Sequence, residues 1–240
     1  MKQILLLTDG CSNCGMNPVA AAAQAYSDGI TVNVIGILDD EHGESEGARE
    51  VAEIAAAGGG MSRNVHVRRL SQTMQMMTQQ TVAHTIQQVV NRQLQQVFGQ
   101  PQMEQLAPQK KAAVVQVMDE LQETSGLRIA LLVDSSLSMK AKLKTVQEAI
   151  ADLLLNLRAR RGKSEICVFH FPAGSDGQGA GLLLDWTSDL AAVQRLFADV
   201  QSRGVTPTGN ALLQVLDYVL ARRVQPAVNE ERGLWSEYVV

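Results

Sequence analysis

The sequence predicts an α/β fold, with a doubly wound, mainly parallel sheet and helices on both faces. Apolar runs of strand length alternate with segments of helical apolar spacing along the 240 residues, as in parallel strands joined by crossover helices. The runs at residues 3–8, 30–38 and 127–133 are almost continuously apolar, which is typical of strands covered on both faces. Each half of the chain offers about three strands, so we expect one sheet built from both halves.

The N-terminal half alternates predicted strands with predicted helices. Pro18 suits the first turn of a helix, and Gly58-Gly59-Gly60 is expected to stop another. The predicted strands are residues 3–8, 30–38 and 64–70, and the predicted helices are residues 19–27, 46–57 and 71–98. The last helix is rich in Gln, and its apolar stripe predicts that one face packs on the sheet. The stripe consists of Val82, Ile86, Val90, Leu94 and Val97.

A linker at residues 99–125 precedes the second half. Residues 103–124 within it have helical character, punctuated by Pro108. The second half begins again with a strand, and its elements alternate in the same way. The predicted strands are residues 127–133, 165–171 and 181–186, and the predicted helices are residues 140–161, 190–200 and 208–222. The tail at residues 225–240 has no clear period.

Composition excludes several classes of function. A hydrophobic content of 45% supports a real core, while a net charge of −4 and a pI near 5.6 argue against a general nucleic-acid binder. Aromatic residues make up only 4%, too few for the stacking platforms that hold single strands.

The chain is expected to be cytoplasmic. Met1-Lys2 leads directly into a strand-like run rather than a secretory signal, and no apolar stretch approaches the roughly 20 residues that span a bilayer. Three cysteines do not make a disulfide framework in a chain of this length. We therefore expect a reduced protein without a membrane span.

Three polar stretches at strand ends or helix starts predict a cation site. Asp134, Ser136 and Ser138 follow the strand at residues 127–133, Asp9 follows the first strand, and Thr206 precedes the last helix. Carboxylate and hydroxyl oxygens are hard ligands that suit Mg²⁺, with Mn²⁺ as the alternative.

These stretches resemble the von Willebrand factor A (VWA) domain. In that family, an Asp-x-Ser-x-Ser segment, a Thr and a Thr-Asp-Gly segment form the metal-ion-dependent adhesion site, MIDAS. Here Thr8-Asp9-Gly10 comes first instead of last. The sequence is therefore similar to a single, circularly permuted domain over residues 1–240. In it, residues 1–98 correspond to the usual C-terminal half and residues 126–224 to the N-terminal half.

The resemblance implies a site and a partner. It places the strand at residues 127–133 beside the strand at residues 3–8, so that Asp134 and Asp9 share one ion. Ser136, Ser138 and Thr206 would supply hydroxyl ligands. A Glu or Asp of a partner protein often completes the metal shell in this family. The resemblance thus implies a metal-dependent protein-binding module rather than an enzyme.

Each stretch taken alone has a simpler interpretation. Asp134 or Ser136 can cap the following helix, because Asp and Ser are favoured N-cap residues. Thr206 or Thr208 can cap the last helix, and we expect Thr208 to do so. Thr8-Asp9-Gly10 alone is a turn. The joint occurrence of all three stretches favours the metal site.

Other functions stay open. One is a Mg²⁺-dependent phosphoryl-transfer enzyme with Asp9 or Asp134 as nucleophile. It is disfavoured because neither acid has a second acid two residues later or an evident lysine partner in the sequence. Another is an accessory subunit of a chelatase or ATPase complex. Cys11-x-x-Cys14 can mark a redox or zinc site, but the next helix begins too late for the former and further ligands are scattered. The sequence has no Walker or Gly-x-Ser-x-Gly motif.

Overall fold

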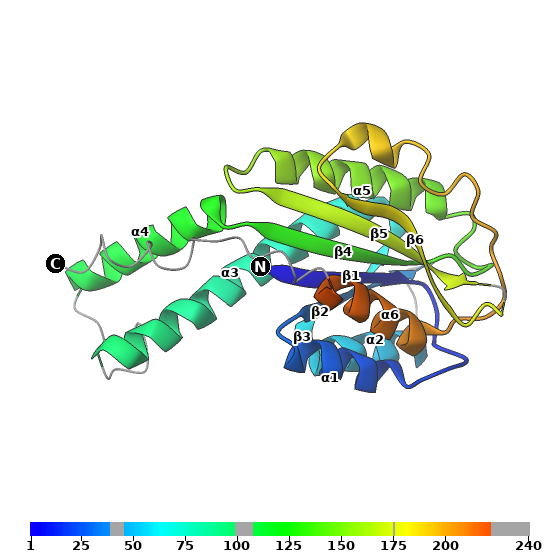
Figure 1. Ribbon diagram of the computed structural model, residues 1–240, viewed down its shortest axis with the longest axis horizontal. Coiled ribbons are helices and arrows are strands. Elements are labelled where there is room, and N and C mark those ends of the chain that lie inside the picture. Colours follow the sequence, from blue (N-terminus) through cyan, green and yellow to red (C-terminus); the bar gives the residue numbers. More distant parts are fainter. Residues whose placement is uncertain (39–45, 99–107, 175, 222–240) are drawn as a thin grey trace.

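Six strands form one sheet in the order β3-β2-β1-β4-β5-β6 (Figure 1). All neighbouring pairs are parallel except β5 and β6, which are antiparallel. The strands are β1 Lys2–Thr8, β2 Thr31–Leu38, β3 Gly59–His66, β4 Leu127–Asp134, β5 Ser164–Ala173 and β6 Gly179–Thr187. The structure is a computed structural model that describes residues 1–240 except 39–45, 99–107, 175 and 222–240. The predicted α/β class is confirmed.

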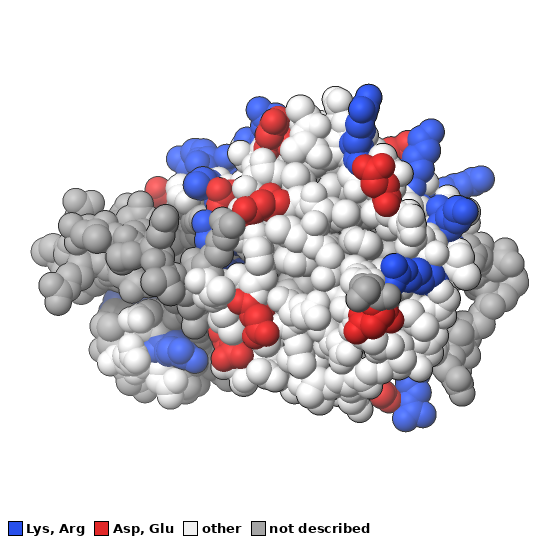
Figure 2. Space-filling model, turned by 45° about the vertical axis from the view of Figure 1, so that its right-hand side comes forward, with Lys and Arg blue, Asp and Glu red and all other residues white. Residues whose placement is uncertain are grey.

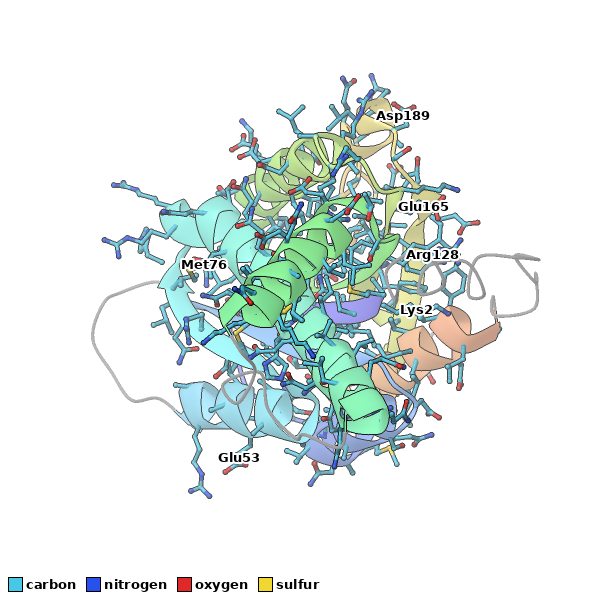
Figure 3. All side chains as sticks on the ribbon, turned by 90° about the vertical axis from the view of Figure 1, so that its left-hand side faces the viewer. Lys2, Glu53, Met76, Arg128, Glu165 and Asp189 are labelled. Carbon is cyan, nitrogen blue, oxygen red and sulfur yellow. The ribbon has the colours of Figure 1, made fainter. Side chains whose placement is uncertain are left out.

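The two halves of the chain meet at the centre of the sheet. β1 pairs with β4 in parallel, and Leu7 lies opposite Val133, so both strands end at the same level. The expectation that these strands are neighbours is therefore confirmed. At the other end of the sheet, Lys2, Arg128 and Glu165 lie side by side across β1, β4 and β5 (Figure 3). Arg128 Nε donates to Glu165 Oε2 at 3.0 Å.

Helices cover both faces of the sheet, which explains the almost continuous apolar runs. Ile4 and Leu6 pack toward one helical layer, whereas Leu5 and Leu7 pack toward the other. Figure 1 shows the first layer below the sheet. It consists of α1 Pro18–Ser27, α2 Glu46–Ala57 and α6 Thr208–Ala221. The second layer consists of α3 Leu70–Phe98 and α5 Leu143–Arg158.

β3 begins earlier than the sequence predicts. The predicted strand at residues 64–70 is wrong at both ends, because β3 occupies Gly59–His66 and the 3₁₀ helix η1 follows at Val67–Arg69. Gly59 has a φ of +61°, and a Cβ on Gly60 would lie 2.1 Å from the Val32 carbonyl oxygen. The glycines thus end α2 as predicted, but they also let the next strand approach β2.

The long helix α3 leaves the sheet and forms an arm with α4 Pro108–Thr124 (Figure 1). Val82, Ile86, Val90 and Leu94 are buried as the apolar stripe predicts, whereas the side chain of Val97 lies outside the described residues. The distal part of the stripe packs with α4 rather than with the sheet. The residues of α4 that join this core are Val114, Met118 and Leu121. Across the described ranges, no helix combines the length and apolarity needed to cross a membrane.

The predicted helix at residues 190–200 is wrong. Only Leu190–Val193 is helical, as the 3₁₀ helix η3, and turns follow it. Its backbone bonds span three residues instead of four, for example Gln194 N to Ala191 O at 3.4 Å. Val193 and Leu196 are nevertheless buried. The apolar spacing therefore predicted which side chains are buried, but not the backbone geometry.

Candidate cation site

Asp134 sits at the C-terminal end of β4 and is bound from both sides. Thr8 Oγ1 donates to its Oδ2 at 2.8 Å, and Ser136 N donates to its Oδ1 at 2.8 Å. The carboxyl is fully buried. These bonds connect the end of β1 to the turn after β4. They lie at the C-terminal ends of the strands, where parallel α/β sheets bind ligands.

Neither Asp134 nor Ser136 caps the following helix. α5 begins at Leu143, and its N-cap residue Lys142 makes no side-chain capping bond. Consecutive turns instead carry the chain from Ser136 to Lys142, beginning with the bond from Met139 N to Ser136 O at 3.1 Å. The capping interpretation is therefore wrong for both residues, and the helix begins later than predicted.

Ser136, Ser138 and Asp9 form a chain of oxygen atoms. Ser136 Oγ lies 3.1 Å from Ser138 Oγ, and Ser138 Oγ donates to Asp9 Oδ1 at 2.8 Å. Ligands in neighbouring positions around Mg²⁺ lie about 3 Å apart, because each ligand is about 2.1 Å from the ion. The spacing of these oxygens fits that requirement. Ser138 is exposed, whereas Ser136 is buried.

Lys142 belongs to this cluster, although it lies outside the motifs that predict the site. Its Nζ lies 2.6 Å from Asp9 Oδ2, and only 7% of the lysine side chain and 3% of the aspartate side chain are exposed. One signal could have found it, since Lys142 precedes Val146 and Ile150 at steps of four residues and so shares the buried stripe of α5. It also overturns the argument that neither acid has a lysine partner.

The loop that carries Thr206 is tied to both other loops. Thr206 N donates to Asn13 Oδ1 at 2.8 Å, and Ser12 Oγ donates to Thr206 O at 3.2 Å. Leu137 N donates to Arg203 O at 2.9 Å. Thr206 is buried, with 6% of its surface exposed. The backbone thus brings all three polar stretches to one end of the sheet.

Thr208 does not cap α6 with its hydroxyl. It is the first residue of that helix, and its buried Oγ1 has no hydrogen-bond partner among the described residues. The expected role of Thr208 is therefore wrong. The neighbouring carbonyl of Pro207 instead accepts from Ala211 N at 3.0 Å.

Burial dominates the electrostatics of Asp134. It raises the pKa of this carboxyl to about 6, while the bonds from Ser136 N and Thr8 Oγ1 act in the opposite direction. On the next residue, Ser135 Oγ lies 3.1 Å from His170 Nδ1, and burial lowers the pKa of that histidine.

Over the face in Figure 2, Lys and Arg side chains are interspersed with Asp and Glu side chains rather than gathered in a basic stripe.

The cysteines contribute no metal cluster. Cys11 and Cys14 are partly exposed, Cys167 is buried, and none of the three forms a disulfide within the described residues. Within the described ranges, no group of three or more His, Cys, Asp or Glu side chains could hold a metal. A cation at the end of β1 and β4 would therefore depend on hydroxyl ligands beside its two carboxylates, and the observed donor set fits Mg²⁺ in that form.

Comparisons with known proteins show close relatives. No family model matches the sequence. The uncharacterized protein YabS of Bacillus subtilis (strain 168) is 44% identical over 236 residues, which cover 97% of this chain and 96% of that protein. The crystal structure of an uncharacterized protein from Alicyclobacillus acidocaldarius subsp. acidocaldarius DSM 446 is 42% identical, with a TM-score of 0.84. The match covers 92% of this chain and 95% of the solved one.

Proposed function

This chain belongs to the family of YabS, and we propose that it is a circularly permuted VWA-type module that docks a protein partner through Mg²⁺. The order of its motifs supports the permutation. If residues 126–224 are placed before residues 1–98, then Asp134-x-Ser136-x-Ser138 comes first, Thr206 second and Thr8-Asp9-Gly10 last. That is the order of the VWA motifs, and the pairing of β1 with β4 is the adjacency that this order requires.

The observation that carries the proposal is the bonded cluster at the end of β1 and β4. Residues more than 120 positions apart meet there, since Thr8 binds Asp134 and Ser138 binds Asp9. Helix capping needs only one side-chain acceptor, so it does not explain a chain of oxygens at this spacing. α5 has no side-chain capping bond at its N-terminus. Convergence of hard oxygens at the C-terminal end of parallel strands supports a cation site.

Each residue would have a definite role toward the ion. Ser136, Ser138 and Thr206 would offer neutral hydroxyls, while Asp134 and Asp9 would bind the ion or its water molecules. With only two carboxylates around it, bound Mg²⁺ would act as a Lewis acid that accepts a carboxylate oxygen from a partner. Thr8 holds Asp134 in place through its hydroxyl.

An exposed apolar side chain on the same turn favours a protein partner. Leu137 stands between the two serines and is 60% exposed. A large apolar side chain beside a polar site contributes to association when a protein covers it, whereas a free phosphate gains nothing from it. We therefore propose a partner segment that presents Asp or Glu.

One contact is also compatible with a second function, that of a phosphoryl-transfer enzyme. Lys142 contacts Asp9, and a lysine beside a carboxylate is also what a phosphoryl-transfer enzyme with Asp9 as nucleophile would use. Both Asp9 oxygens are already engaged, one by Ser138 and one by Lys142, which argues against a free nucleophile.

The test is calorimetric titration of Mg²⁺ and Mn²⁺ into the wild-type protein and Asp134→Ala. We expect binding by the wild type and none by the variant. Capture from the native host in Mg²⁺ and in EDTA should then yield a protein that is retained only with the metal. Hydrolysis of p-nitrophenyl phosphate by the wild type, lost in Asp9→Asn, would favour the enzyme instead.

A further inference from the structure

We infer that the positive charge of Lys142 lowers the affinity of the site for a metal ion. We also infer that it raises the affinity of the metal-loaded site for a carboxylate of a partner. This inference rests on the proposed function and adds a residue that sets both its metal affinity and its preference for an anionic partner. No part of the Asp-x-Ser-x-Ser pattern points to it.

The geometry makes Lys142 part of the site rather than part of the surface. Its Nζ binds Asp9 Oδ2 at 2.6 Å, while Asp9 Oδ1 accepts from Ser138 Oγ at 2.8 Å. The two side chains are 7% and 3% exposed, so water screens this pair only weakly. The neighbouring Lys140 and Lys144 are exposed and therefore differ from Lys142 in burial while sharing its charge.

The balance of charges gives the expected effect. Asp134 and Asp9 bring two negative charges, and Lys142 returns one positive charge. A divalent ion added to this set leaves the cluster with one positive charge in excess, whereas the same set without the lysine would be neutral. The ammonium thus repels the incoming cation, and the loaded cluster attracts an anion more strongly.

The experiment compares Lys142→Met and Lys142→Gln with matched controls. Lys140→Met and Lys144→Met remove the same charge from exposed positions two residues away on either side. Lys142→Gln keeps a hydrogen-bond donor for Asp9, so it covers the case in which the methionine variant does not fold. Lys142→Arg keeps the charge and should restore wild-type behaviour.

Mn²⁺ affinity is measured by electron paramagnetic resonance of the free ion. We expect Lys142→Met and Lys142→Gln to bind Mn²⁺ about 10- to 100-fold more tightly than the wild type, and the two control variants to stay within about twofold. N-acetyl-L-glutamate is then titrated into the Mn²⁺-loaded proteins. Its binding should weaken by about fivefold or more in the Lys142 variants, so that the two affinities change in opposite directions.

The outcomes separate this inference from the function on which it rests. If the wild type binds Mn²⁺ but folded Lys142→Gln binds it no more tightly, or binds N-acetyl-L-glutamate equally well when loaded, the inference is overturned and the metal site stands. If neither the wild type nor any Lys142 variant binds Mn²⁺ above the level of Asp134→Ala, the proposed function itself fails.

Discussion

At the scale of single residues, the candidate site is held in shape by neutral donors around a buried acid. Asp134 receives one hydroxyl and one backbone amide, and both come from groups that the fold fixes in place. Such preorganisation lets oxygens converge without help from the ion. It also has a cost, because a buried carboxylate is harder to ionise than an exposed one.

Asp134→Asn should stabilise the metal-free protein at neutral pH. The folded-state pKa of about 6 exceeds the ordinary 3.8, so folding becomes less favourable as pH rises from about 4 to 6 and the penalty then stays constant. The shift corresponds to about 3 kcal/mol at pH 7. In EDTA at pH 7.5, we expect the variant to gain about 1–3 kcal/mol in urea unfolding.

The same variant provides its own control. Near pH 4 its advantage should vanish, because the wild-type carboxyl is then protonated in the folded state. Addition of Mg²⁺ at pH 7.5 should stabilise the wild type and leave Asp134→Asn unchanged. A variant that is less stable than the wild type in EDTA at pH 7.5 would contradict the prediction.

Ser138→Ala tests ligation by a surface hydroxyl. Because Ser138 is exposed, its removal should barely change the thermal midpoint in EDTA. We expect Mg²⁺ affinity in calorimetry to fall about tenfold, as one ligand is lost. Ser188, which follows the edge strand β6, is also exposed, and Ser188→Ala should bind Mg²⁺ as the wild type does. Unchanged affinity in Ser138→Ala would count against ligation.

The sequence predicted the acids and serine hydroxyls that meet at the candidate site, but not how they are held. Asp134, Ser136 and Asp9 were selected because their motifs follow apolar strands. Lys142 was missed because its contact with Asp9 spans 133 residues and leaves only a weak trace in the spacing of α5. Thr208 was assigned the wrong role, since a threonine at a helix start predicts capping whether or not its hydroxyl can reach an amide.

At the scale of elements, sequence patterns predicted the central strands and the edge strand β6 well, but the edge strand β3 poorly. β1, β2 and β4 are covered on both faces, so their apolar runs are unambiguous. β3 at the edge is polar and glycine-rich, and its position depends on contact with β2 rather than on its own composition. Spacing at residues 190–200 could not separate an α-helix from 3₁₀ turns of similar period.

Two threonines of α3 give a matched test of its packing. Thr78 and Thr81 are both buried, but Thr78 Oγ1 has no hydrogen-bond partner in the described part of the chain. Thr81 Oγ1 bonds to Asn33 and to Met77 O, the latter at 2.8 Å. Thr78→Val should therefore stabilise the protein by up to about 1 kcal/mol, and Thr81→Val should destabilise it by about 1–3 kcal/mol.

Urea unfolding of both variants measures the difference. The two substitutions have the same shape and lie three residues apart in one helix, so their effects on helix propensity cancel in the comparison. Equal effects would mean that the polar network of Asn33 and Thr81 does not hold α3 on the sheet.

At the scale of the whole molecule, the first two residues contact segments that are distant in the sequence. Lys2 Nζ donates to Val219 O at 3.1 Å, which brings the last described helix beside β1. The Met1 ammonium donates to Gly126 O at 2.6 Å, where the linker joins β4. Both contacts fit a domain whose chain ends have moved to this place from the connection between the arm helices.

A permutant should therefore keep the fold. Opening the chain between residues 102 and 103 and joining residue 240 to residue 1 preserves every strand. We expect the thermal midpoint to change by less than about 5 °C and Mg²⁺ affinity to stay within about threefold, measured by circular dichroism and calorimetry. A matched cut between Ser136 and Leu137 should abolish Mg²⁺ binding. Aggregation of the first permutant would contradict the permuted-domain proposal.

The arm extends away from the C-terminal ends of β1 and β4 (Figure 1). Its longer helix has 29 residues and is thus about 43 Å in length. A biotin-acceptor peptide inserted between its two helices would therefore orient every molecule on a sensor chip in the same way. The oxygen-lined end would face the flowing solution, ready for screening of candidate binders in magnesium or chelator.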